Sequence, residues 1–174
     1  AQFLEGTGSI VFDHQSKIAY ACSSSRTSFF LLTEVTRFLG YKIHFFYSKT
    51  QDNVAIYHTN VMMSIGKQFS MVGLDTLNDK NQKRNLEISL LESGREIIQL
   101  SHAQIHSFAG NTLELRGKNG SVLAISDTAF RSLNTNQIAQ IEKYTQILPL
   151  NIPTIELAGG SVRCMLAGIH CQPK

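Results

Sequence analysis

Apolar and polar positions repeat along this chain in an order that predicts two short strands, a helix and a third strand. The first set begins with strands at 9–13 and 17–23, where β-forming residues dominate. Apolar residues then recur every third or fourth position over 27–39, as on one face of a helix, and Gly40 follows as a typical helix end. The segment 42–47 predicts the closing strand of this set.

The same order of elements occurs twice more. The second set has strands at 60–66 and 68–74, a helix at 81–94 and a strand at 95–100. The third has strands at 111–117 and 121–126, a helix at 134–148 and a strand at 152–157. The segment 161–170 predicts one more strand, the first element of a fourth set.

This period of about fifty residues predicts an α/β protein made of ββαβ repeats. Each such unit buries its apolar face against a neighbour, so the repeats are expected to stack or to close on themselves. We expect a single domain over 1–174, with repeats at about 5–57, 58–110 and 111–160 and a closing strand at 161–170.

Four side chains with catalytic chemistry follow this repeat. Glu5, His58, Asn111 and Cys164 are each 53 residues apart, so they occupy equivalent positions in successive units. Equivalent positions converge around the axis when repeats close into a ring. We therefore expect a carboxylate, an imidazole, an amide and a thiol to face one central cavity.

These groups match the needs of nucleophilic catalysis. A cysteine attacks as its thiolate, whose ordinary pKa of roughly 8.5 falls when a cation lies close. A histidine, with an ordinary pKa near 6.5, can protonate a leaving amine and then deprotonate a water. Read alone, Cys164 could be a buried structural thiol, but Gly159, Gly160, Arg163 and the repeat favour a nucleophile.

Composition narrows the class of protein. The chain has 174 residues, 43% of them hydrophobic, and a formal charge of +3 from scattered Lys and Arg, which argues against a nucleic-acid surface. No apolar run is long enough to cross a membrane. Cys22, Cys164 and Cys171 are an odd number without a CxxC pair, which favours a reducing cytoplasm. Cys22 and Cys171 are expected to be packing residues.

Two histidines raise the question of a metal site. His102 and His106 have the i, i+4 spacing that can bind metal on a helix. The glutamate of a His-Glu-x-x-His motif is absent, because Ala103 stands in its place. We expect a turn that leads to Asn111 and no metal or cofactor.

Five separated motifs resemble the C-terminal part of the guanidino-group-modifying enzymes, the pentein superfamily of arginine deiminases, dimethylarginine hydrolases and amidinotransferases. They are LEGTGS, SRTSFFLL, YHTNVMMSIG, FAGNTLEL and ELAGGSVRCMLAGI, in that order. The most similar branch is that of the arginine-deiminase-related citrulline-utilisation hydrolases. The resemblance implies an α/β propeller of five ββαβ units, of which about three are present here. The others would precede this chain or come from a partner, such as a second copy.

The resemblance also implies roles for single residues. Cys164 would be the covalent nucleophile, His58 the general acid and base, and Glu5 the partner of His58 or of a substrate nitrogen. Arg26 would hold the α-carboxylate of an amino-acid substrate. Asn111 matches a family position near the site, and we expect Asn60 and Asn111 to bind the substrate together with Arg26.

Two departures from arginine deiminases bear on the substrate. Asn60 stands where those enzymes have an aspartate after the histidine, and the turn Glu-Gly-Thr-Gly at 5–8 lacks a second acid. A neutral ureido group needs mixed donors and acceptors, whereas a guanidinium needs carboxylates. We therefore expect a cysteine-dependent hydrolase of citrulline. The alternatives are arginine deiminase, dimethylarginine hydrolase, amidinotransferase and a non-catalytic binding protein on the same propeller fold.

Overall fold

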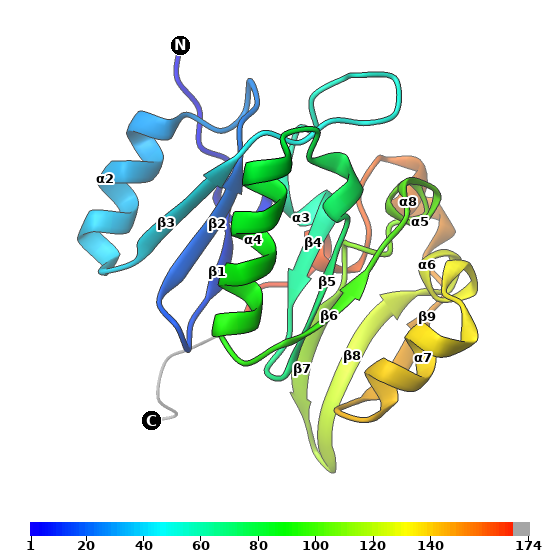
Figure 1. The fold of residues 1–174 in the computed structure, drawn as a ribbon. Helices are drawn as coiled ribbons and strands as arrows, with labels where there is room; N and C mark the ends of the chain where they lie inside the picture. The colour runs from blue at the N-terminus through cyan, green and yellow to red at the C-terminus, as the bar shows by residue number, and fades with distance from the viewer. Residues whose placement is uncertain (169–174) are drawn as a thin grey trace.

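Three small sheets of three strands each form the framework of the protein, in a computed structural model that describes residues 1–168 (Figure 1). In every sheet the first two strands are antiparallel, and the third joins the second in parallel after a helical connection. The strands are β1 (Val11–Asp13), β2 (Ile18–Cys22) and β3 (Lys42–Phe46) in the first sheet, β4 (Met63–Ile65), β5 (Phe69–Val72) and β6 (Glu96–Gln99) in the second, and β7 (Leu113–Gly117), β8 (Gly120–Ser126) and β9 (Gln146–Leu150) in the third.

The helical connections lie between the second and third strand of each sheet, as the ββαβ pattern predicts. They are α2 (Phe29–Leu39), α4 (Lys80–Glu92) after the 3-10 helix η1 (Leu74–Thr76), and the pair α6 (Asp127–Ser132) and α7 (Thr135–Glu142). Short helices lead into or out of the sheets: α1 (Gly6–Ser9), α3 (Thr59–Met62), α5 (His102–His106), α8 (Pro153–Leu157) and the 3-10 helix η2 (Val162–Met165).

Local sequence explains where the long helices begin and end. Gly40 ends α2 in the left-handed conformation at φ 73°, which glycine adopts without steric cost. The carboxylate of Asp79 caps α4 by accepting from the backbone N–H groups of residues 81 and 82. Asn134 and Gln137 form a capping box at the start of α7. These signals are readable in the sequence.

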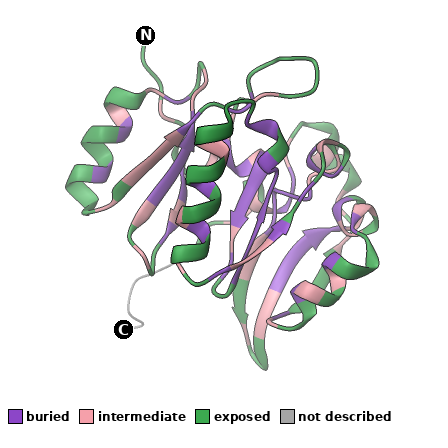
Figure 2. Ribbon diagram, in the orientation of Figure 1, coloured by how far each residue is buried: buried purple, intermediate pink, exposed green. Residues whose placement is uncertain are grey.

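The core lies between the sheets, where the strands are buried and the outer faces of the helices are exposed (Figure 2). Met62 and Met63 are both fully buried. One continuous apolar cluster includes residues of all three sheets, for example Tyr20, Met71 and Leu123. Burial of each such side chain contributes about 1.5–3 kcal/mol to the stability of the fold. The three sheets therefore stabilise one another through this shared core.

A buried ion pair fixes the first sheet to the second. Arg95, just before β6, donates from Nη1 to Asp13 Oδ2 at 2.6 Å and from Nη2 to Asp13 Oδ1 at 2.8 Å. Its Nε donates to the carbonyl oxygen of Gly66 at 2.8 Å. Both side chains are almost fully buried. Burial acts to raise the pKa of Asp13, but hydrogen bonds from Ser16 and the charge of Arg95 outweigh it and lower the pKa.

The third unit differs from the sequence-based expectation. The helix expected over 134–148 ends at Glu142. The residues 146–148, which were expected to belong to this helix, are part of β9. The segment 152–157, expected as a strand, contains the short helix α8. Pro153 is its first residue, a position where the fixed φ of proline favours a helical turn. Pro149 lies within β9, which is an edge strand and tolerates a missing N–H.

Three further expectations need correction. The expected strand at 161–170 is wrong over its described part, because η2 occupies Val162–Met165; residues 169 and 170 lie outside the described part of the chain. The first half of the expected strand at 60–66 is the helical turn α3. The expected turn around His102 and His106 is the helix α5, which begins with a capping box of Ser101 and Gln104.

The expected α/β fold of ββαβ units is confirmed. Each sheet lies within one of the three expected repeats. The assignment of all 174 residues to one domain stays a prediction. Over residues 1–168, every helix is too short or too polar to cross a membrane.

Candidate active site

Glu5 and His58 form one half of the candidate site. Each residue directly precedes a short helix, Glu5 before α1 and His58 before α3, so the repeat places the two helix starts side by side. The imidazole Nε2 of His58 lies 2.7 Å from the carboxylate Oε2 of Glu5. This contact gives the ring a fixed orientation.

A glycine on α1 provides the space for this imidazole. A Cβ atom added at Gly8 would lie 2.8 Å from both Cε1 and Nδ1 of His58, a distance that such atoms essentially never show. The ring is therefore held between the backbone at Gly8 on one side and the Glu5 carboxylate at Nε2.

We expect Gly8→Ala to displace the His58 ring and to lower kcat by roughly 10-fold to 100-fold. A catalytic group that is misplaced by about 1 Å can lower the rate by up to about 100-fold. The measurement is kcat and thermal stability of the full-length protein, with Thr7→Ala at the neighbouring exposed position of α1 as the control. An unchanged kcat in Gly8→Ala would show that this packing has no role in activity.

Cys164 forms the other half of the site. It lies in η2, is exposed, and is a free thiol. Its Sγ accepts from the amide Nδ2 of Asn111 at 3.2 Å and lies 3.7 Å from Nδ2 of Asn60. A Cβ at Gly160 would lie 3.1 Å from the Cβ of Cys164, so the glycine lets the backbone turn closely around the thiol.

A buried guanidinium adjoins the thiol. Burial lowers the pKa of Arg163 to about 10, and the charge of Cys164 acts in the opposite direction. The Nε of Arg163 is buried without a hydrogen-bond partner.

Residues on both sides of His58 connect the two halves. Tyr57 donates from its hydroxyl to the carbonyl oxygen of Gly159 at 3.0 Å, and Asn60 contacts the sulfur of Cys164. Burial and the charge of Cys164 raise the pKa of Tyr57, against the opposing charge of Arg26. The segment 57–60 therefore lies against the Cys164 loop.

Arg26 lies at the rim of this cluster. Its guanidinium is 3.5 Å from Glu5 Oε2 and lies over the Tyr57 ring, 5.2 Å from the ring centroid. The side chain is about half exposed (51%), so it can reach a ligand without leaving the rim. A guanidinium at this position can pair with a carboxylate through two parallel hydrogen bonds.

All six predicted site residues thus lie in two contacting groups. One contains Glu5, His58 and Arg26, and the other contains Cys164, Asn60 and Asn111. The roles of these residues stay predictions. Gly8 and Tyr57 had no predicted role, and the sequence marks them only by their positions near Glu5 and next to His58.

The other candidate groups have different surroundings. Cys22 is fully buried, and burial raises the pKa of its thiol to about 11, which suits a packing residue. Cys171 lies outside the described residues. His102 Nε2 lies 3.2 Å from the carbonyl oxygen of Asp75. Over the described part of the chain, no three His, Cys, Asp or Glu side chains gather as a metal site.

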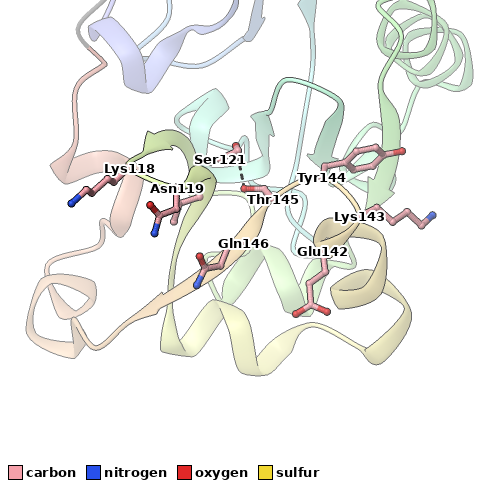
Figure 3. A pocket seen from close by; sticks show the side chains of 10 residues that line it. Lys118, Asn119, Ser121, Glu142, Lys143, Tyr144, Thr145 and Gln146 are labelled. Carbon is pink, nitrogen blue, oxygen red and sulfur yellow. Dashed lines mark hydrogen bonds between the residues drawn. The ribbon is translucent and has the colours of Figure 1, made fainter.

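Cavities occur away from these residues, near the β7–β8 turn. One, of about 440 Å³, lies between this turn and the end of α7, and Figure 3 shows Lys118 and Asn119 on one side and Glu142 and Lys143 on the other. The hydroxyls of Ser121 and Thr145 are 3.2 Å apart in its wall. A second, of about 690 Å³, shares Lys118 and Ser121. Neither is lined by a predicted site residue, and the hydrogen-bonded cluster around Cys164 is the better candidate on chemical grounds.

Comparison with known proteins gives one family match. Residues 1–171 match the family model described as N,N dimethylarginine dimethylhydrolase, eukaryotic. The sequence matches no curated relative.

Solved structures of low sequence identity share the fold. ArgZ, an arginine dihydrolase of the ornithine–ammonia cycle in cyanobacteria, is 13% identical with a TM-score of 0.73 over 92% of this chain and 24% of its own. AgrE with ornithine and NAD+ is 15% identical with a TM-score of 0.74, over 92% of this chain and 22% of its own. SxtG, a Microseira wollei amidinotransferase of saxitoxin biosynthesis, is 14% identical with a TM-score of 0.59, over 90% and 42%. This chain therefore spans less than half of each of these proteins.

Proposed function

Since this chain belongs to the N,N-dimethylarginine dimethylhydrolase family within the pentein superfamily, we propose that it carries the nucleophile of a cysteine-dependent hydrolase. The bond cleaved is a carbon–nitrogen bond of a ureido or guanidino amino acid, with citrulline as the first candidate. The observations that carry this proposal are the pairing of His58 with Glu5 and, two residues after His58, the contact of Asn60 with a sulfur that accepts an amide hydrogen bond from Asn111.

The reaction proceeds in two steps at Cys164. Its thiolate attacks the planar ureido carbon, and His58 donates a proton to the leaving amine as the C–N bond breaks. With citrulline, ornithine leaves and a carbamoyl thioester stays on Cys164. His58 then removes a proton from water, which attacks the thioester and regenerates the thiol. The released carbamate decomposes to carbon dioxide and ammonia.

The neighbours of these two groups take supporting roles. The Glu5 carboxylate accepts a hydrogen bond from His58 and stabilises the imidazolium that forms when the ring takes up a proton. Arg26 at the rim binds the α-carboxylate of the substrate, and this exchange releases it from Glu5. The substrate is thereby held at one end by its carboxylate and presents its other end to Cys164.

The charge around the thiol favours a neutral substrate. Of the six predicted site residues only Glu5 is acidic, and it already contacts two basic side chains. Asn60 has a buried Oδ1 without a hydrogen-bond partner, which can accept an N–H from a ureido group. A guanidinium in this place would have no dedicated carboxylate and would lose part of its solvation.

A second candidate is hydrolysis of N,N-dimethylarginine to citrulline and dimethylamine. The family match over residues 1–171 favours it. It uses the same nucleophile and the same acid–base residue, and differs only in the substrate that the pocket accepts.

A substrate panel on the full-length protein separates these candidates. We expect ornithine and ammonia from citrulline with a kcat/KM at least about tenfold above that for arginine or dimethylarginine, since loss of one charge pair costs more than about 1.4 kcal/mol. Faster formation of citrulline from arginine or dimethylarginine than of ornithine from citrulline would refute the citrulline assignment.

Labelling with iodoacetamide tests whether the site is catalytic at all. We expect rapid modification of Cys164 that citrulline suppresses, and slow modification of the buried Cys22. Equal labelling of the two thiols, together with no turnover of any substrate, would favour a binding protein on the same fold. An exposed thiol that must stay reduced also supports our assignment of the protein to the cytoplasm.

A further inference from the structure

The Asn111 side chain is buried and makes hydrogen bonds to Cys164, the proposed nucleophile, and to Asn60. It is only 2% exposed, and its Nδ2 donates both to Cys164 Sγ at 3.2 Å and to the carbonyl oxygen of Asn60 at 3.0 Å. Its Oδ1 accepts from the backbone N–H of Cys164 at 3.4 Å. Both N–H groups of the amide are therefore engaged, and its oxygen holds the Cys164 backbone.

The backbone around Asn111 is held as firmly as the side chain. A Cβ at Gly110 would lie 2.4 Å from the carbonyl oxygen of Val61 and 2.8 Å from the carbonyl carbon of Met62, so only glycine lets this loop pack on α3. The carbonyl oxygen of Asn111 accepts from the backbone N–H of Arg163 at 3.2 Å. Asn111 is thus fixed between α3 and η2.

We infer that Asn111 is a positioning residue for the nucleophile, which orients Cys164 through its backbone and stabilises the anionic sulfur by donating to it. This inference rests on the proposed function of Cys164. A hydrogen bond to the charged form of a group favours that form, and an N–H bonded to an anion is about twice as strong as one to a neutral acceptor. In this structure Asn111 contacts the attacking atom itself.

The two amide side chains near the sulfur, Asn60 and Asn111, differ in their contacts. Asn60 Nδ2 is farther from Cys164 Sγ, at 3.7 Å, and its Oδ1 has no partner, so Asn60 keeps a free acceptor for substrate. Arg163 and Tyr57 interact electrostatically with Cys164. The charged or titratable groups of the adjoining half of the site are Glu5, His58 and Arg26. All of these groups stay unchanged in the variants below, so a change in thiol reactivity reports on the amide.

The test is the pH dependence of iodoacetamide alkylation at Cys164, followed by peptide mass spectrometry in the full-length protein. We expect Asn111→Ala to be alkylated about tenfold more slowly at pH 7 and to reach its plateau rate at higher pH. Asn111→Asp keeps the shape and the acceptor but places a carboxylate at the sulfur, so its profile should move further in the same direction. Asn119→Ala, at an exposed turn, is the matched control.

A role in packing alone would alter the thermal stability of Asn111→Ala without moving its alkylation profile, and that result would overturn the inference. Because alkylation needs no turnover, failure of the citrulline panel leaves this test intact. Turnover with unchanged alkylation in both variants would refute the inference and spare the proposed function.

Discussion

Cys164→Ala in the full-length protein is expected to lower kcat by roughly four orders of magnitude or more, whichever substrate proves correct. The sulfur is the atom that bonds to the substrate carbon in the proposed reaction, and no other group of the site can replace it. Glu5, His58 and Arg26 would still hold the substrate, so its Kd should change by less than about tenfold. Turnover and equilibrium binding of citrulline measure the two effects separately.

The control for this experiment is Cys22→Ala, which removes the other described thiol. Cys22 is fully buried in the core, so the variant should lose stability but keep its kcat when folded. His58→Gln provides a complementary result: kcat should fall by about 100-fold or more, because both protonation of the leaving amine and activation of the attacking water lack their group. A Cys164→Ala protein with substantial kcat would remove the basis of the covalent mechanism.

Arg95→Ala is expected to lower the free energy of unfolding by about 3–5 kcal/mol, because it leaves the Asp13 carboxylate buried and uncompensated. The loss falls on the contact between the first two sheets, and hence on the approach of Glu5 and Arg26 to His58. Urea unfolding measures it. In Arg84→Ala, at an exposed position of α4, the change should stay within about 0.5 kcal/mol.

The same ion pair sets a pH dependence. The pKa of Asp13 lies below its ordinary value of 3.8 in the folded protein, so its contribution is fully present above that pH and is lost as the pH falls below it. We expect a weaker loss of stability below pH 3.8 in Asp13→Asn. The double variant Asp13→Asn, Arg95→Met should recover part of the loss in Arg95→Ala. If all of these proteins unfold alike, the pair contributes nothing to stability.

Local features of the sequence predict the order of the helices and strands. Helix caps such as Gly40 and Asp79, and runs of β-forming residues, predict three ββαβ units, and the three sheets confirm them. The 53-residue spacing also relates the correct partners, since Glu5 contacts His58 and Asn111 contacts Cys164. Helix caps and β-forming runs depend on neighbours within a few residues, so they can be recognised without knowledge of the fold.

The secondary structure predicted from the sequence is wrong in segments whose backbone hydrogen-bond partners are distant in the sequence. An apolar run around Cys164 predicts a strand, but it forms η2, where the N–H groups of Arg163 and Cys164 bond to Asn111. The segment 152–157 forms α8 because β9 has already completed the third sheet.

The sequence by itself determined the class of fold, the repeat and the set of candidate site residues, because these follow from side-chain type and spacing. Only the tertiary structure decided which atoms meet: the imidazole over Gly8, the Tyr57 hydroxyl on Gly159, and the Asn111 amide on the sulfur. The physical reason is that such contacts depend on space and hydrogen-bond geometry between units, which no local pattern contains.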